Sequence, residues 1–487
     1  MNPTDNHRPS APSPSGPGLP PTGRATSRRH LLRSAAAGFG WLAFRGLAAD
    51  AGAAPTPAGT PGESTGRPAI RHHRATARRV IFLCMQGGPS HQDTFDPKPR
   101  LRRDHGKSGP GRGRGTQLVG SPFAFRQHGQ SGLWMSELFP HLSGQADRLC
   151  MVHSMRTDIP NHPQAFTQLH TGSARFVRPS LGSWVLYGLG SANENLPGFI
   201  SISPPARLGA ANYGSAFLPA LYQGTRIGSG REGSSEAGMS HVTQGQFTTG
   251  QQRRQLDLVH AMNRERLDGA PGAEPGGGAI EAAIQAGELA FRMQSEVPDL
   301  LDLGRESAAT RALYGIGETG VDGFARQCLL ARRFAEAGAR FIEVNLGGWD
   351  QHQNLEAALR KNARALDRPA AGLIADLDAR GLLDDTLVLW GGEFGRTPDS
   401  RQQDGRDHNH RGFTVWMAGG GVRGGMTHGR TDEYGAQAIE DPVHIHDLHA
   451  TLLHTLGLDH ERLTFRYGGR DHRLTDVHGS VVRAVLG

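Results

Sequence analysis

Three short apolar runs, each followed by glycine and then by polar residues, constrain the fold of this chain most strongly. They lie at residues 80–85, 341–346 and 386–390, and the last leads into Gly-Gly-Glu-Phe-Gly-Arg. Apolar, β-branched runs of this length are too short for buried helices and are typical of strands covered on both faces. Glycine lets the backbone turn sharply where such a strand ends. We therefore expect a sheet with polar loops at its strand ends, where open α/β sheets bind ligands.

The periodicity between these runs predicts how the strands are connected. From residue 321 onward the pattern reads helix, strand, helix, strand, strand, helix. This order predicts an α/β domain over residues 80–487, with a doubly wound, mostly parallel sheet and helices on both faces. A short helix is expected at 134–142. Short apolar pieces between Gly, Ser and Pro indicate an insertion around 181–320 that shapes the substrate cleft.

The first 79 residues differ in composition from the rest. The sequence Ser-Arg-Arg-His-Leu-Leu-Arg at 27–33 resembles a twin-arginine export signal, so residues 1–53 are expected to form the signal region. Residues 54–79 are rich in Pro, Gly and Arg and are expected to be a disordered linker. The apolar stretch of the leader is too short and too interrupted for a stable membrane span. We expect export by the twin-arginine machinery to the periplasm, the cell envelope or the extracellular space.

The net charge of +7 comes from the leader and not from the body. Residues 1–79 hold 11 Lys and Arg against 3 Asp and Glu, whereas residues 80–487 hold 42 against 43. A near-neutral body gives no reason to expect nucleic-acid binding. The three cysteines are widely spaced and form no Cys-x-x-Cys pair, so neither a disulfide framework nor a structural zinc site is indicated.

Carboxylate and imidazole side chains collect after the three expected strands. The carboxyl ends of parallel strands meet at one edge of a sheet, so we expect these side chains to converge. Mixed oxygen and nitrogen ligands suit zinc, with manganese or iron as alternatives, better than calcium. The candidate metal ligands are Asp350, His352, His408, Glu393, Asp407, His91 and Asp93.

A polar segment after the expected strand at 149–152 leads into a helix that should end at Gly172. Asn161 is a candidate N-cap residue, and Pro163 suits the first turn. His162 lies between them, where a helix N-terminus attracts anions. It is a candidate catalytic residue, with capping or support of a neighbouring ligand as the alternative.

Five motifs of the body form a set with a known counterpart. They are GGPSHQDTFDPKP (87–99), GGWDQHQN (347–354), GGEFGRTP (391–398), GRDHNH (405–410) and the segment 444–479. With the leader they cover most of the chain. They resemble the exported family catalogued as domain of unknown function 1501, within the alkaline phosphatase/sulfatase-like superfamily. The resemblance implies an alkaline phosphatase-like core.

The superfamily resemblance also implies roles for individual residues, with departures. Asp350, His352 and His408 match the ligands of a first metal, and Glu393 takes the place of a second-site Asp. Phe394 stands where that second site normally has a His. A two-zinc phosphatase site is therefore not intact, and a second metal would need other ligands, such as those of the motif at 87–99.

The positions of the nucleophile also depart from the superfamily. His162 stands where Ser, Thr or Cys is usual. Cys328 has Arg332 four residues on, but Leu330 replaces the proline of the sulfatase motif Cys-x-Pro-x-Arg, which argues against a formylglycine sulfatase.

The resemblance implies an exported metal-dependent hydrolase of a phosphate or sulfate ester, with carbohydrate esters among the candidates. The catalytic candidates are His162, Glu393 and Arg396. Arg396 either clamps the anion through two hydrogen bonds or pairs with Glu393. Direct attack by a metal-activated water is favoured over covalent catalysis by His162. The alternative is a non-catalytic envelope protein that binds polysaccharide on a degraded alkaline phosphatase-like fold. The sequence leaves the oligomeric state open.

Overall fold

The computed structural model describes residues 70–108, 115–206, 212–228, 248–268, 277–402 and 404–487. The expected signal region and residues 54–69 of the expected linker lie outside these ranges. The linker prediction does not hold for residues 70–79, because this segment packs onto the body. Ala77 is buried, and the backbone N–H groups of Thr76 and Ala77 both donate to Thr455 O at 2.8 Å.

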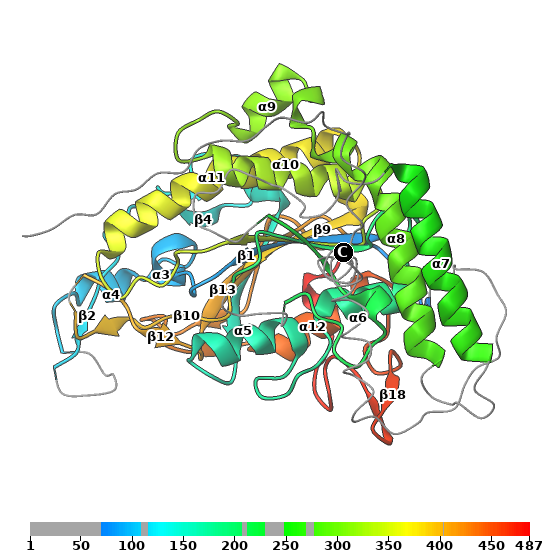
Figure 1. Cartoon of the computed structure of the whole chain (residues 1–487). Helices are drawn as coiled ribbons and strands as arrows, with labels where there is room; N and C mark the ends of the chain where they lie inside the picture. Colours follow the sequence, from blue (N-terminus) through cyan, green and yellow to red (C-terminus); the bar gives the residue numbers. More distant parts are fainter. Residues whose placement is uncertain (1–69, 109–114, 207–211, 229–247, 269–276, 403) are drawn as a thin grey trace, which may run out of the picture. The chain divides into compact units, whose positions relative to one another are not determined.

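In the described residues, nine strands form one sheet (Figure 1). In spatial order they are β14 (Met426–His428), β5 (Leu149–Arg156), β13 (Phe413–Ala418), β9 (Thr386–Gly391), β1 (Arg79–Met85), β8 (Phe341–Leu346), β6 (Phe199–Ile202) and β7 (Thr225–Ile227), with β17 (Val443–His444) also paired to β5. β13 runs antiparallel to β5 and β9, and the other pairings of these strands are parallel. The prediction of a mostly parallel α/β sheet is confirmed.

Helices cover both faces of this sheet (Figure 1). The helices of the described residues are α3 (His91–Thr94), α4 (Pro99–Arg103), α5 (His162–Thr171), α6 (Leu181–Leu189), α7 (Thr249–Asp268), α8 (Gly277–Leu301), α9 (Ala308–Tyr314), α10 (Asp322–Glu336), α11 (Leu355–Ala379) and α12 (Ile445–Thr455). Figure 1 places α10 and α11 on one side of the sheet, and α5, α6 and α12 on the other.

The central strand β1 shows how alternation divides the core between these layers. Ile81, Leu83 and Met85 belong to the apolar cluster that also contains the buried faces of α10 and α11. Phe82 and Cys84 belong to the cluster built with α5, α6 and α12. Since successive side chains of a strand point to opposite faces, one uninterrupted apolar run supports both layers.

Smaller strand pairs form outside the main sheet. They are β2 (Gln117–Leu118) with β11 (Asp399–Ser400), β3 (Phe125–His128) with β4 (Leu133–Ser136), β10 (Gly395–Arg396) with β12 (His408–Asn409), β15 (Arg430–Thr431) with β16 (Ala438–Glu440), and β18 (Phe465–Tyr467) with β19 (Arg470–His472). None of the helices in the part of the chain just described is long and apolar enough to cross a membrane.

Two expected segments differ from the structure. The helix expected at 134–142 is wrong: Leu133 and Met135 are buried while Trp134 is exposed, which is the period-two pattern of strand β4. The expected insertion at 181–320 contains β6 and β7, which extend the central sheet beyond β8. All four residues of β6 are buried, as is typical of a strand that lies inside a sheet and is covered on both faces. β6 pairs with β8 on one edge and with β7 on the other.

The contact between α12 and α5 predicts a loss of stability in mild acid. His449 on α12 is buried and donates from Nε2 to Leu169 O at 2.7 Å. Burial, followed by the nearby His446, lowers the pKa of His449 from 6.5 to about 3. Because the unfolded chain takes up this proton below pH 6.5 and the folded chain does not, the free energy of unfolding should fall with pH. The slope from this residue is about 1.4 kcal/mol per pH unit, or about 2 kcal/mol at pH 5.

Denaturant unfolding at pH 7.5 and pH 5 measures this effect, with His449→Gln as the comparison. The glutamine variant should lose part of the difference in stability between the two pH values. An identical pH dependence in both proteins would contradict the prediction.

Candidate functional site

Strand register brings the three polar loops to one edge of the sheet. β1 lies between β8 and β9, with Met85 opposite Leu346 and Cys84 opposite Gly391. The segments after these strands therefore start side by side. The Trp349 N–H donates to Gln86 O at 3.1 Å, which fixes the loop after β8 against the loop after β1.

The short pair β10–β12 delivers the fourth polar segment to this edge. Arg396 lies opposite His408 in its antiparallel register. The backbone N–H of Thr397 also donates to Asp407 O at 2.9 Å. The loop at 405–410 is thereby folded back onto the strand end that carries Glu393.

One carboxylate oxygen lies at the centre of the candidate site. Asp350 Oδ1 is close to three imidazole Nε2 atoms, those of His162 at 3.2 Å, His352 at 3.1 Å and His408 at 3.3 Å. The same oxygen accepts a hydrogen bond from the Arg396 guanidinium at 2.7 Å. The Nε2 atoms of His352 and His408 lie only 2.9 Å apart. Two ring nitrogens at that separation need a proton or a cation beside them, because facing lone pairs repel.

The other nitrogen of each imidazole is held by an oxygen acceptor. The pairs are His408 Nδ1 with Pro160 O at 3.0 Å, His352 Nδ1 with Asp407 Oδ1 at 3.2 Å, and His162 Nδ1 with Glu393 Oε1 at 2.6 Å. Carbonyl and ionised carboxylate oxygens only accept, so each Nδ1 carries a proton and donates it. The Nε2 atoms are then left as inward-facing ligand atoms. Such an outer hydrogen bond is typical of histidines that ligate metals.

Glu393 is buried and is the hydrogen-bond partner that orients the His162 ring. Its carboxylate accepts from His162 Nδ1 and from the backbone N–H of Gly87, at 3.0 Å to one oxygen and 3.2 Å to the other. Burial alone would lower the pKa of His162, but hydrogen bonds to Asp350 and Glu393 raise it to about 9. In the metal-free protein His162 is therefore an imidazolium between two carboxylates.

Asp350 remains ionised in these surroundings. Burial raises the pKa of its carboxyl, but hydrogen bonds from His162, His408 and Arg396 outweigh burial and hold the pKa well below its usual range. The side chain is still 46% exposed and that of His352 is 41% exposed. The centre of the cluster is thus accessible from solvent.

Arg396 does not have the geometry of an anion clamp. Its side chain is fully buried, and its N–H groups donate to the carbonyl oxygens of Gly87, Gly88, Trp349 and Arg406 as well as to Asp350. The carboxylate with which it pairs is Asp350, rather than the expected Glu393. The guanidinium therefore connects three loops and positions Asp350.

His91 and Asp93 also have partners of their own. Both are buried in α3, and His91 Nε2 contacts Gly435 O at 2.9 Å. Asp93 accepts two hydrogen bonds from Arg406, at 2.6 and 3.1 Å. Among the described residues, the groups of side chains spaced to hold one metal ion include neither His91 nor Asp93. Their expected role as ligands has no support from this geometry, because Asp93 is paired with Arg406 and His91 contacts Gly435 through Nε2, apart from the ligand groups.

The residues present at the centre fit a divalent cation. His162, Asp350 and His408 each offer one ligand atom, and these atoms lie within 4.8 Å of one another. His352, with Asp407 behind it, lies next to this group. The sequence motifs pointed to all five residues, but they gave no sign of Pro160, whose carbonyl oxygen orients His408. Backbone acceptors of this kind leave no mark on side-chain patterns.

The close approach of two loops predicts a strict requirement for glycine at position 87. Gly87 has φ of +115°, and a Cβ there would lie 2.5 Å from Asp350 N and 2.7 Å from the Trp349 carbonyl carbon. Gly87→Ala should therefore cost about 3 kcal/mol or more, through backbone strain plus a backbone collision. Gly317→Ala is the matched control, because Gly317 has φ of +90° and open space around its Cβ position. It should cost only about 1–2 kcal/mol.

Thermal unfolding of the two alanine variants beside the unmodified chain measures the difference. Equal losses of stability at positions 87 and 317 would show that the two loops can move apart at Gly87 to make room for a methyl group.

Solved structures with some similarity to the chain include an alkaline phosphatase, a sulfatase and a phosphonate monoester hydrolase. A mutant of TAB5 alkaline phosphatase with Mg bound is 11% identical, with 79% of this chain and 99% of that chain covered and a TM-score of 0.33. The PsFucS1 sulfatase from Pseudoalteromonas sp. is 14% identical, covering 79% and 68%, with a TM-score of 0.33. The phosphonate monoester hydrolase SpPMH from Silicibacter pomeroyi is 11% identical, covering 84% and 76%, with a TM-score of 0.32.

A comparison with curated proteins found no match. The family model described as protein of unknown function (DUF1501) matches residues 77–486, and the chain therefore belongs to this family.

Proposed function

We propose that the chain is an exported, metal-dependent hydrolase of phosphate or sulfate esters. The observation that carries the proposal is the convergence of three anchored imidazoles on Asp350 Oδ1. Their Nδ1 atoms are committed to oxygen acceptors, so their Nε2 atoms face one another and a carboxylate. This arrangement suits a cation far better than an empty centre. Export is proposed from the Arg28-Arg29 leader.

The ligand chemistry favours zinc, with manganese or iron as alternatives. Two imidazoles and one carboxylate, from His162, His408 and Asp350, leave a coordination position open. A bound divalent metal of this kind lowers the pKa of a coordinated water toward about 7. His162 thus becomes a ligand in this proposal, instead of the catalytic group expected from its position in the sequence.

Attack by water is favoured over a covalent intermediate on His162. Nδ1 of His162 donates to Glu393, and Nε2 faces Asp350 at 3.2 Å, so neither nitrogen is free to attack a substrate. His352 is the most exposed imidazole of the cluster, and Asp407 accepts from its Nδ1. We assign His352 with Asp407 as the pair that moves a proton to or from the reacting oxygens.

The anionic part of the ester is expected beside the N-terminus of α5. That helix begins at His162, so its positive end faces the Asp350 centre. Arg396 contributes no direct contact to the ester, because its donors are already used.

Metal content and chelator-sensitive hydrolysis together test the proposal. Elemental measurement on untagged protein should find at least one zinc, manganese or iron per chain, and the Asp350→Ala/His408→Ala variant should contain one ion fewer. A panel of aryl phosphate, phosphodiester and sulfate esters should include a substrate whose hydrolysis stops with a chelator and returns with metal. Bound metal without hydrolysis of any ester would favour the envelope binding protein, and absence of metal in folded protein would refute the proposal.

A further inference from the structure

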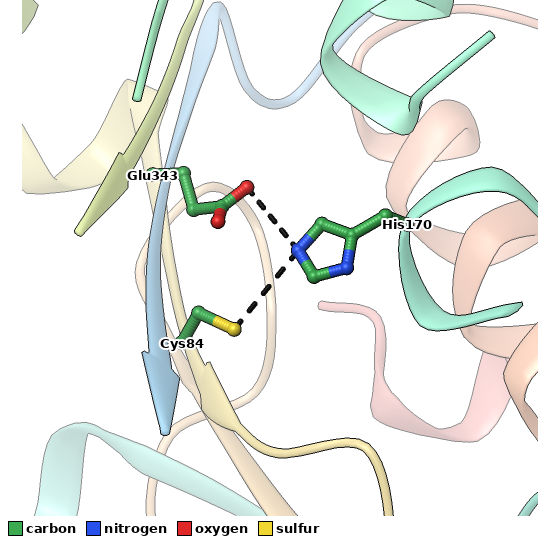
Figure 2. A group of neighbouring side chains, drawn as sticks. All are labelled: Cys84, His170 and Glu343. Carbon is green, nitrogen blue, oxygen red and sulfur yellow. Dashed lines mark hydrogen bonds and ion pairs between the residues drawn. The ribbon is translucent and has the colours of Figure 1, made fainter. Parts of the chain in front are cut away.

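A second group of ligand-type side chains lies inside the sheet–helix interface (Figure 2). Cys84 comes from β1, Glu343 from β8 and His170 from the last turn of α5. In the parallel register Glu343 lies opposite Phe82, and Cys84 is two residues further on, so both side chains point to the same face of the sheet. Figure 2 shows them directed at the His170 imidazole. All three residues are buried.

We propose that Cys84, His170 and Glu343 form a buried zinc site, separate from the solvent-accessible Asp350 centre. One sulfur, one nitrogen and one oxygen ligand would come from three different elements. The proposal does not depend on the hydrolase activity inferred above.

The distances between the ligand atoms suit one tetrahedral ion. His170 Nε2 lies 3.3 Å from Glu343 Oε2 and 4.0 Å from Cys84 Sγ. Zinc bonds of roughly 2.0–2.3 Å place neighbouring ligand atoms about 3.3–3.6 Å apart. The nitrogen–oxygen pair already has this spacing, and a small rotation of the Cys84 side chain brings the sulfur to it.

Outer hydrogen bonds orient the ligand atoms toward one another. His170 Nδ1 donates to Phe166 O at 2.8 Å, which leaves Nε2 facing the other two side chains. Glu343 Oε1 accepts from Asn212 Nδ2 at 3.1 Å. Glu343 Oε2 is fully buried, and the partner that it has among the described side chains is the His170 ring, at 3.3 Å. A buried carboxylate oxygen aimed at an imidazole nitrogen and a thiol needs a cation, either a proton on the ring or a metal ion.

The ligand types distinguish between these two cations. Without a metal, the sulfur would be a thiol beside a His170–Glu343 ion pair and would have no part in balancing the carboxylate. With zinc the thiol loses its proton and becomes a ligand. A thiolate with an imidazole and a carboxylate selects zinc over calcium or magnesium.

The position of this site suggests a structural role. α5 has His162 at its first residue and His170 in its last turn. An ion bound to His170, Cys84 and Glu343 would fix the C-terminal end of α5 against β1 and β8, and thereby hold His162 at the Asp350 centre.

Cobalt substitution tests the proposal with a readout that is independent of activity. Metal-free full-length chain, kept reduced, is equilibrated or refolded with Co²⁺, and the thiolate-to-cobalt charge-transfer absorption in the near ultraviolet is recorded. The band should appear in the unmodified protein and in the Asp350→Ala/His408→Ala variant, and it should be lost in Cys84→Ser. Cys150→Ser and Cys328→Ser are matched controls, because these cysteines are also buried and free. Both should keep the band.

Two results would overturn the zinc site. One is an unmodified, folded protein without a charge-transfer band, which decides the question even if Cys84→Ser fails to fold. The other is a band that survives in folded Cys84→Ser. Failure of the proposed hydrolase function is distinguishable, since it would remove chelator-sensitive ester hydrolysis and leave the cobalt–thiolate band intact.

Discussion

Replacing Asp350 with alanine is expected to abolish metal binding at the Asp350 centre and ester hydrolysis together, which lowers the metal content by one ion per chain. Its Oδ1 atom is the meeting point of three imidazole Nε2 atoms at 3.1–3.3 Å, and it also takes the hydrogen bond of Arg396. Without the carboxylate, the site loses its anionic ligand atom, and the Arg396 guanidinium is left without its counter-charge beside the cation. Loss of several kcal/mol of metal assistance corresponds to about 10³-fold in rate. Elemental analysis and hydrolysis of the best ester of the panel measure the two effects.

Two further variants show whether the effect is specific to the Asp350 centre: a control with no expected effect and a variant with a partial effect. Asp378 is 44% exposed, similar to Asp350, and pairs with Arg148 on the surface, so Asp378→Ala should keep full metal content and activity. Glu393→Gln removes the support of His162 without removing a ligand, and it should weaken metal binding about 10–100-fold. Equal metal content in folded Asp350→Ala and unmodified protein would contradict the assigned centre.

The sequence predicted the frame of the fold because its strongest signals are local. The strand at 341–346 has the bounds that its apolar run indicates. The direction of β13 is not local information, since an antiparallel strand can have the same apolar run as a parallel one. β6 and β7 were missed for a related reason: four and three residues between glycine-rich segments are too few to show a period.

The candidate site was predictable in its residue types but not in its pairings. The loops after β8 and β9 supplied Asp350, His352, Glu393, Asp407 and His408. Two arginines, Arg396 and Arg406, lie in the same region, and nothing in the sequence says which carboxylate each one takes. The structure pairs Arg396 with Asp350 and Arg406 with Asp93. The second pairing removes Asp93 from the set of ligands.

One feature of the sequence does indicate the buried group around Glu343. A glutamate in the middle of the apolar run Phe-Ile-Glu-Val-Asn-Leu is unusual, because fully buried carboxylates need a partner. The sequence could not name that partner. His170 lies on α5, 173 positions earlier in the chain, and Cys84 is in a different strand. Their contact depends on strand order and helix placement, which are properties of the whole fold.

The Asp93–Arg406 pair leads to the second large effect, on stability. Both side chains are fully buried, and the guanidinium donates twice to the carboxylate and also to the carbonyl oxygens of Thr397 and Pro398. Arg406→Met leaves a buried carboxylate without its cation and should cost about 3–5 kcal/mol in the free energy of unfolding. Arg148→Met breaks an exposed pair and should cost less than about 1 kcal/mol.

The pH dependence separates this charge effect from lost packing. Burial raises the pKa of Asp93, but Arg406 outweighs burial and lowers it. The pair therefore stabilises the folded chain at pH values above the usual pKa range of a carboxyl group. This contribution is lost as the pH falls through the pKa of the folded state. In Arg406→Met only the hydrogen bonds of Ser90 and Ser121 still oppose burial, and Asp93 takes up a proton more readily. The stability gap between the two proteins should therefore be widest near pH 7 and narrower at pH 4.5. Asp93→Leu/Arg406→Met should also be more stable than Arg406→Met at pH 7, since no buried charge remains. A gap independent of pH, with the double variant the least stable, would assign the loss to packing.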